Sequence, residues 1–338
     1  AVAPHDEYSD KLVAAGCVYH PVKMDSRGVN PVKDFALTLE LYNIYKKIRP
    51  ETILHYTIKP NIYGTFAASL LKIPVVNNVC GLGTAFLQKN LVSYIAIGLY
   101  KLAFRTPRKI FFQNIDDKEF FEEKGIVKKN QSEVIPGSGI DISKFVPGKK
   151  KKNKGNKFTF LLISRLIYDK GIVEYVEAVK HLRENGVDAD FQLLGSKDPV
   201  HRRGIPEELI DKWVETNSID YLGSTDDVRP FIENANCVVL PSYREGTPRT
   251  LLEAASLEKP IVASKVAGCT NIVKDQHNGL LCEVMNATDL ASKMNQMINI
   301  PEEKRSEMGK NGRILVESRF KQEFVIDKYL DTIDKIGQ

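Results

Sequence analysis

The second half of the chain alternates short apolar runs with stretches of helical periodicity, and this alternation limits the fold more than any other feature. The apolar runs are rich in β-branched residues, as buried strands are. They lie at 157–164, 189–195, 219–223, 236–242, 259–264 and 278–283. Helical stretches occupy 170–185, 206–217, 226–234, 248–258 and 287–299. Alternating strands and helices predict a parallel sheet covered by helices on both faces.

The first half repeats this pattern with strands expected at 51–57, 73–79 and 108–114. We therefore predict an α/β chain of two doubly wound, Rossmann-like domains facing a cleft. The opening stretch AVAPHDEYSDKL is typical of a strand end, a turn and a helix start, so we expect the first strand of the N-terminal domain to be absent. The expected divisions are a first domain at 1–147, a linker at 148–156, a second domain at 157–320, and a C-terminal helix at 321–338 that packs back on the first domain.

Composition narrows the function classes. Hydrophobic residues make up 43% of the chain and charged residues 27%, values typical of a folded soluble protein. The net charge of +5 suits an anionic small ligand or an anionic membrane surface, and it is small for a dedicated nucleic-acid binder. The lysine-rich stretch PGKKKKNKGNK indicates a solvated linker or, alternatively, a contact with polyanions. The five cysteines are scattered, which favours reduced thiols and no zinc site. The apolar run at 91–104 is too short to span a membrane, and no signal peptide opens the chain, so we expect a cytoplasmic protein.

Two cations follow the first strand of the second domain. In SRLIYDKG, Arg165 stands at the strand exit and Lys170 at the next helix start. Ligands of open α/β sheets bind beyond the carboxyl ends of the strands, and these two cations suit a diphosphate. The alternative is an ordinary pair of solvated surface cations.

The stretch YREGTPRTLLEA, after the strand at 236–242, places two acids around a helix start. Pro248 suits the first helical turn and Thr247 a cap, so the free amides of that turn would attract an anion. Glu245 lies before the helix and Glu253 inside it, where a carboxylate can accept bonds from vicinal hydroxyls. A diphosphate flanked by a ribose and a sugar would use all these parts; a capped helix with two surface acids is the alternative.

Other loops at strand exits carry weaker signals. STDDVRP could read a nucleobase edge or simply cap a helix through Thr225 or Asp226, and VAGCTN places a glycine where backbone can approach a ligand closely. Asp188 and Asp190 have the spacing of a metal-binding pair, but they lie at the entry of a strand, away from the expected cleft. No P-loop and no serine-hydrolase elbow is present.

The two motifs after the strands together resemble a known family. SRLIYDKG followed by LPSYREGTPRTLLEA is similar to the family 4 retaining glycosyltransferases, with their Arg-x4-Lys and Glu-x7-Glu signatures. The stretch 55–86 and the opening residues resemble the capsular-polysaccharide and lipid-linked-oligosaccharide branch, including members that add α-1,3-linked N-acetylgalactosamine to a bacillosamine-type lipid. The resemblance implies a GT-B fold whose second domain holds most of the donor.

The resemblance also implies roles for single residues. Arg165 and Lys170 would hold the donor diphosphate, Glu253 the ribose hydroxyls and Glu245 the donor sugar. The remaining positions expected to bind substrate are Gly195, Asp227, Val228, Gly246, Thr247, Pro248, Arg249, Thr250, Cys80, Gly81 and Gly83. Many members carry His-Gly where this chain has Cys80 and Gly81, so the family's histidine role is not assigned here.

The implied activity is transfer, with retention, of a hexose or N-acetylhexosamine, N-acetylgalactosamine first, from a UDP-sugar to a polyprenyl-diphosphate-linked sugar in bacterial glycan assembly. No metal or cofactor is expected, and no nucleic acid. The segment 91–109 could lie on anionic lipid, making the protein peripheral on the inner face of the plasma membrane, or could be a core helix with a basic end. The alternative functions are a UDP-sugar-binding protein without transfer activity and a GT-B UDP-sugar epimerase.

Overall fold

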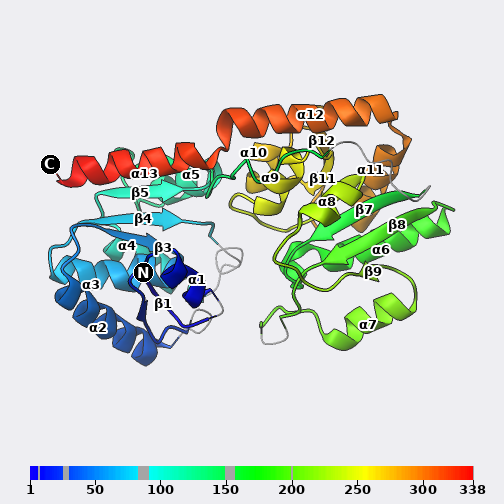
Figure 1. Cartoon of the computed structure of the whole chain (residues 1–338). Helices are drawn as coiled ribbons and strands as arrows, with labels where there is room; N and C mark the ends of the chain where they lie inside the picture. Colours follow the sequence, from blue (N-terminus) through cyan, green and yellow to red (C-terminus); the bar gives the residue numbers. More distant parts are fainter. Residues whose placement is uncertain (7, 26–29, 83–90, 149–156, 199–200, 338) are drawn as a thin grey trace. The chain divides into compact units, whose positions relative to one another are not determined.

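The computed structural model describes residues 1–6, 8–25, 30–82, 91–148, 157–198 and 201–337. The chain divides into two compact units. The first comprises Ala1–Ile135 with Lys328–Gln338, and the second comprises Pro136–Asp327. Both units are drawn in Figure 1.

The first unit contains a parallel sheet in the order β3-β4-β5-β6 and a separate parallel pair, β1-β2. Its strands are β1 (Val2–Ala3), β2 (His20–Pro21), β3 (Ile53–Tyr56), β4 (Val75–Val79), β5 (Lys109–Phe112) and β6 (Ser132–Val134). Its helices are α1 (Ser9–Ala14), α2 (Pro31–Ile48), a π-turn at Pro60–Gly64, α3 (Thr65–Leu70), α4 (Leu91–Ala103) and α5 (Ile115–Glu123).

Opposite faces of this sheet have different partners. On one face, Ile53 and Val75 pack with residues of α2 and α3, and Ile110 and Phe112 pack with Phe121 of α5 and with α4. Phe111 points the other way and meets the ring of Tyr329, whose centroid lies 5.0 Å away. Tyr329 belongs to α13 (Gln322–Gly337), so the end of this last helix covers the second face within the first unit.

The second unit holds a six-stranded parallel sheet in the order β12-β11-β10-β7-β8-β9. Its strands are β7 (Phe158–Ile163), β8 (Ala189–Leu194), β9 (Asp220–Tyr221), β10 (Cys237–Leu240), β11 (Ile261–Ser264) and β12 (Gly279–Cys282). Its helices are a 3-10 turn at Tyr168–Lys170, α6 (Ile172–Glu184), α7 (Glu207–Glu215), α8 (Arg229–Asn234), α9 (Arg249–Ser256), α10 (Ala267–Ile272), α11 (Ala287–Asn299) and α12 (Glu302–Arg319).

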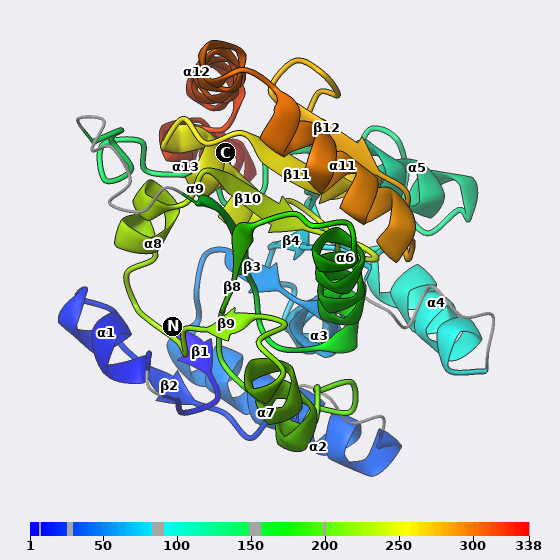
Figure 2. The same ribbon diagram turned by 90° about the vertical axis from the view of Figure 1, so that its right-hand side faces the viewer.

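Alternate residues of each central strand face opposite cores. Phe160 and Leu162 of β7 pack beneath α6 and α11, which lie side by side in Figure 2. Leu161 and Ile163 face a second core built with α8, α9, α10 and α12. This is the three-layer, doubly wound arrangement predicted for the second domain. The prediction was possible because strands buried on both faces are mostly apolar.

Candidate functional site

The strand order of the second unit reverses between β7 and β10. From β7 the chain proceeds outward through β8 and β9, and then returns to start β10 on the other side of β7. The two strands pair in parallel, with Phe160 opposite Cys237 and Leu162 opposite Val239. Their following loops therefore leave the same edge of the sheet at the position where open α/β sheets bind ligands.

The loops after β7 and β10 are joined by an ion pair. Lys170 Nζ donates to Glu245 Oε1 at 2.5 Å, and the two side chains are 21% and 10% exposed. Gly171 brings the loops together, with a φ of 70° and its α-carbon against Pro241, where an added Cβ would lie 2.1 Å from the carbonyl oxygen. Only glycine tolerates both that backbone conformation and that approach.

Glu253 lies in α9 and is almost completely buried, with 8% of its surface exposed. Arg249, one turn earlier, donates from Nε to its Oε1 at 3.0 Å. Burial raises the pKa of Glu253, and the Arg249 guanidinium offsets part of that shift. Thr250 donates to the carbonyl of Ile163 at 3.3 Å, which ties the first turn of α9 to the end of β7.

The start of α9 differs slightly from the prediction. The helix begins at Arg249, and Pro248 is its N-cap in an extended conformation, so Thr247 is not the capping residue. Thr247 instead packs against Gly137, and a Cβ added at Gly137 would lie 2.7 Å from the Cβ of Thr247. Gly246 contacts Gly268 at the start of α10, where a Cβ would lie 2.3 Å from the Gly246 oxygen. The glycine of VAGCTN thus serves close packing of the Glu245–Gly246 backbone.

Arg165 is the second residue after β7 and is exposed. Within the described part of the chain it has no ion-pair partner. Gly195, after β8, donates from its amide to the Gly223 carbonyl at 2.7 Å, and its α-carbon lies against the Ser164 carbonyl. These contacts hold together the residues that follow β7, β8 and β9 at the carboxyl edge of the sheet.

Asp227 and Val228 lie in the loop before α8. Asp227 forms a 2.8 Å ion pair with Arg229, whose guanidinium lowers the pKa of the carboxyl group. Val228 is the N-cap of α8, and Thr225 accepts a bond from the Asp227 amide. The predicted cap by Thr225 or Asp226 is therefore not formed, because the helix starts at Arg229, beyond this turn.

Two supporting residues beside this site did not stand out in the sequence. Asp169 accepts from Arg203 Nε at 2.6 Å, and its carbonyl accepts from the amide of Tyr243 at 2.9 Å. Tyr243 donates to Glu174 at 2.7 Å. Burial, with the nearby Glu174 carboxylate, raises the pKa of the Tyr243 hydroxyl. Their adjacency to Lys170 and Glu245 was the available signal, since they brace the segments that carry the ion pair.

The predicted residues of the first unit lie after β4. Cys80 is partly exposed, and burial raises the pKa of its thiol. Gly81 has a φ of 129°, and Gly83 lies outside the described residues. Cys80 Sγ is 3.6 Å from Asn78 Oδ1. The side-chain amide nitrogen of Asn78 donates to the Tyr329 hydroxyl at 2.5 Å.

Within the described ranges, no group of three or more His, Cys, Asp or Glu side chains is placed to hold a metal ion. In that same part of the chain, no helix is long and apolar enough to cross a membrane.

Comparison with protein families gives two matches. The model described as "Glycosyl transferases group 1" matches residues 147–315, and the one described as "Glycosyl transferase 4-like" matches residues 2–114. The first covers the whole candidate site of the second unit.

Individual relatives span nearly the whole chain. The N,N'-diacetylbacillosaminyl-diphospho-undecaprenol alpha-1,3-N-acetylgalactosaminyltransferase of Campylobacter jejuni is 29% identical over 99% of this chain and 90% of its own length. The UDP-Gal:alpha-D-GlcNAc-diphosphoundecaprenol alpha-1,3-galactosyltransferase of Escherichia coli is 26% identical over 90% of this chain and 80% of its own length.

Solved structures agree on the fold. HepE from Anabaena, crystallised with UDP, superposes with a TM-score of 0.79 at 18% identity, covering 97% of this chain and 89% of HepE. Sucrose-phosphate synthase from Thermosynechococcus elongatus superposes with a TM-score of 0.81 at 19% identity, covering 95% and 84%. The predicted GT-B fold class is confirmed.

Proposed function

The chain belongs to the glycosyl transferases of group 1, and we propose that it moves a sugar from a UDP-sugar to a polyprenyl-diphosphate-linked sugar during bacterial glycan assembly. The single observation that carries the donor side is the Lys170–Glu245 ion pair at the β7–β10 switch point, with the buried Glu253 in the helix that follows. N-acetylgalactosamine is the first candidate for the transferred sugar, and another N-acetylhexosamine or a hexose is the alternative.

On the donor side, Arg165 and Lys170 bind the diphosphate, and Glu253 accepts bonds from the ribose hydroxyls. The backbone of Gly246 and Thr247 runs beside the diphosphate near the start of α9, whose dipole favours negative charge. Since Lys170 is paired with Glu245 in this structure, the incoming diphosphate competes for the ammonium. Its arrival leaves the Glu245 carboxylate to accept bonds from the hydroxyls of the donor sugar.

The reaction proceeds with retention and without a bound metal. As the bond from the anomeric carbon to the diphosphate breaks, negative charge grows on the leaving oxygen. Fixed cations placed there stabilise the transition state more than the ground state. The departing phosphate takes the acceptor proton. An α-linked product from an α-linked donor, identified by NMR, and full activity in EDTA are expected; a β-linked product or loss of activity in EDTA contradicts this mechanism.

The acceptor is supported by the two relatives from Campylobacter jejuni and Escherichia coli, which are named as transferases to undecaprenol-diphosphate-linked sugars. A lipid-linked acceptor requires access to a membrane surface. Helix α4 supports this, since Tyr94, Ile95 and Leu102 are 64%, 47% and 53% exposed and Lys101 lies beside them. An exposed apolar and basic helix of this kind binds the interface of anionic lipid.

The test is UDP release from a panel of UDP-sugars, with and without a short-chain polyprenyl-diphosphate-linked sugar. Acceptor-dependent release from one donor is expected. Binding of UDP without release from any donor would instead support a UDP-sugar-binding protein, and acceptor-independent conversion of one UDP-sugar into another would support an epimerase.

A further inference from the structure

The first unit has a cavity of about 540 Å³ at the amino ends of its strands. Val75, the first residue of β4, lines it, and so do Arg108 and Gln131, which directly precede β5 and β6. The cavity therefore lies at the edge opposite to Cys80, which follows β4. It also belongs to a different unit from the proposed donor site.

Four cations and no carboxylate line this cavity. They are Lys72, Arg105, Arg108 and Lys128, and all four side chains are exposed. In the described ranges, none of the four forms an ion pair. They come from three loops, those after α3, after α4 and after α5, so local sequence does not group them.

One acid of β6 and one acid of α5 are paired with lysines that do not line the cavity. Glu133 of β6 pairs with Lys109 at 2.5 Å and also with Lys328. Glu122 of α5 pairs with Lys118 at 2.9 Å. Neither carboxylate pairs with a cation of the cavity, so neither neutralises the positive charge of its lining.

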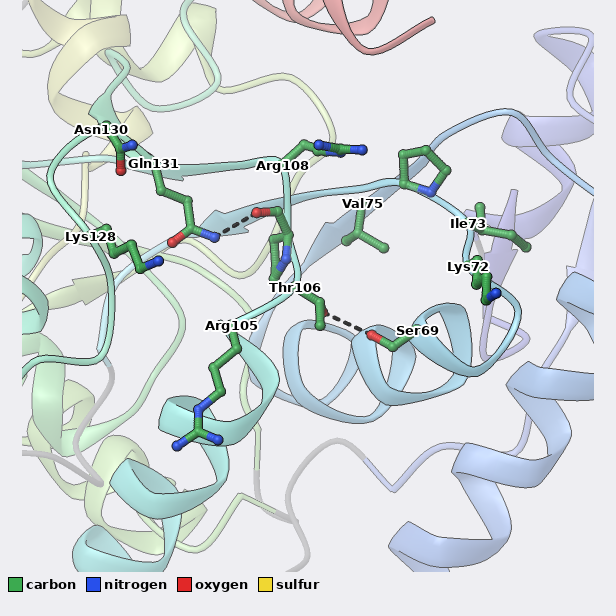
Figure 3. Close-up of a pocket in the computed structure, with 12 residues that line it drawn as sticks. Ser69, Lys72, Ile73, Val75, Arg105, Thr106, Arg108, Lys128, Asn130 and Gln131 are labelled. Carbon is green, nitrogen blue, oxygen red and sulfur yellow. Dashed lines mark hydrogen bonds between the residues drawn. The ribbon is translucent and has the colours of Figure 1, made fainter.

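The loop that carries both arginines is braced. Gln131 donates from Nε2 to the carbonyls of Pro107 at 2.5 Å and Phe104 at 3.2 Å. Thr106 and Ser69 share a hydroxyl hydrogen bond of 2.8 Å, and the Arg108 amide donates to the Val75 carbonyl. Figure 3 shows Arg105, Arg108, Lys128 and Lys72 arranged around this loop. A fixed backbone reduces the entropy lost when a ligand binds.

We propose that this cavity binds a phosphate group, as a second anion site separate from the donor site. Arginine binds phosphate through paired N–H donors, and lysine contributes a point charge, so two of each suit a dianionic phosphate or a diphosphate. The group can come from a soluble phosphate compound or from the headgroup of an anionic lipid, since α4 leads directly into Arg105. This inference does not depend on transferase activity.

The experiment compares the full chain with the Arg105→Gln/Arg108→Gln double variant, and uses Lys46→Gln/Lys47→Gln on α2 as a charge-matched control. Binding of inorganic diphosphate is measured by calorimetry with UDP in excess, and vesicles of phosphatidylcholine with and without phosphatidate are tested by co-sedimentation. UDP titration and circular dichroism of each variant report separately on the proposed donor site and on folding.

A loss of about tenfold or more in diphosphate affinity in the double variant alone is expected if the ligand is soluble, since two charge-assisted contacts are removed. If only phosphatidate vesicles bind, and the double variant loses that binding, the source is a lipid headgroup. Equal binding by the double variant and the control, or no binding of either probe, overturns the proposal. The cations would then only offset the partial negative charges at the C-terminal ends of α3 and α4.

Discussion

Lys170 Nζ lies 2.5 Å from Glu245 Oε1, although 75 positions separate the two residues in the chain. The pair forms because β7 and β10 are neighbours in the sheet and their loops leave the same edge. Each half of the pair comes from one of the two signature motifs. The structure therefore brings two separate sequence signals into contact, the cation that we propose binds the diphosphate and the acid that we propose binds the donor sugar.

Replacing Arg165 by alanine should reduce transfer by about 10² to 10³-fold, because a fixed donor to the developing charge is lost. The effect should fall on kcat more than on KM for the donor. Arg202→Ala is the matched control, since Arg202 is also exposed and lies outside the site. Steady-state kinetics of both variants measure the effect. Equal transfer rates for the two variants would show that Arg165 does not stabilise the transition state.

Glu253 should make the folded protein less stable as the pH rises through the pKa of its buried carboxyl group. Burial raises the pKa of its carboxyl group above 4.5 in the folded state, so the folded chain binds the proton more tightly than the unfolded chain. This contribution is complete below the ordinary glutamate pKa and is lost as the pH rises through the higher folded value. Urea unfolding from pH 4 upward should show a decline in the wild type that Glu253→Gln lacks; identical slopes in both proteins would contradict the assignment.

Gly171→Ala should destabilise the second unit more than Gly186→Ala does. Both glycines have a positive φ, 70° and 75°, so each substitution carries a backbone cost of about 1–2 kcal/mol. At Gly186 nothing lies within 4 Å of the added Cβ, whereas at Gly171 the Pro241 oxygen lies 2.1 Å away. The difference between the two free energies of unfolding isolates the clash.

The same pair of variants also tests the site. Gly171→Ala should weaken UDP binding because the loops that carry Lys170 and Glu245 are pushed apart, and Gly186→Ala should leave UDP binding unchanged. Equal unfolding free energies and equal UDP affinities would show that the close approach at Pro241 has no role.

Membrane binding should depend on the exposed apolar side chains of α4. Ile95→Glu combined with Leu102→Glu should abolish binding to anionic vesicles, since charge at the apolar face opposes insertion into the interface. Ile314→Glu on α12 is the control, because Ile314 is 63% exposed but belongs to the second unit. Vesicle flotation measures the effect, and unchanged binding by the double variant would exclude α4 as the contact.

The strands of the second unit were largely predictable. The expected run 157–164 is observed as β7 at Phe158–Ile163, and 278–283 as β12 at Gly279–Cys282. Burial on both faces makes these strands apolar at nearly every position, which is a strong local signal. By contrast, β6 (Ser132–Val134) was missed, since a short edge strand with a glutamate carries no apolar pattern.

Helix starts were less predictable. The helix expected at 226–234 begins at Arg229. Before it, the Asp227 amide donates to the Thr225 hydroxyl in a local turn, and the Asp227 carboxylate forms an ion pair with Arg229. The signature motifs supplied the residues of the proposed site, but not the contact between Lys170 and Glu245. That contact depends on strand order, which is a property of the whole sheet and is not written in either motif.

The cationic cavity of the first unit was also beyond the sequence. Lys72, Arg105, Arg108 and Lys128 come from three loops, and each looks like an ordinary surface cation by itself. They meet only because β4, β5 and β6 are adjacent and parallel, so that the loops entering them share one edge.

The most direct test of the account is the rate of UDP release with a polyprenyl-diphosphate-linked sugar as acceptor, measured for the wild type, Glu245→Ala and Glu208→Ala. Glu208 is an exposed acid of α7 and serves as the control. We predict acceptor-dependent release by the wild type and the control, and a loss of at least about 10²-fold in Glu245→Ala, because the acid proposed to contact the donor sugar is removed. Undiminished release by Glu245→Ala would contradict the proposal that the Lys170–Glu245 pair marks the donor site.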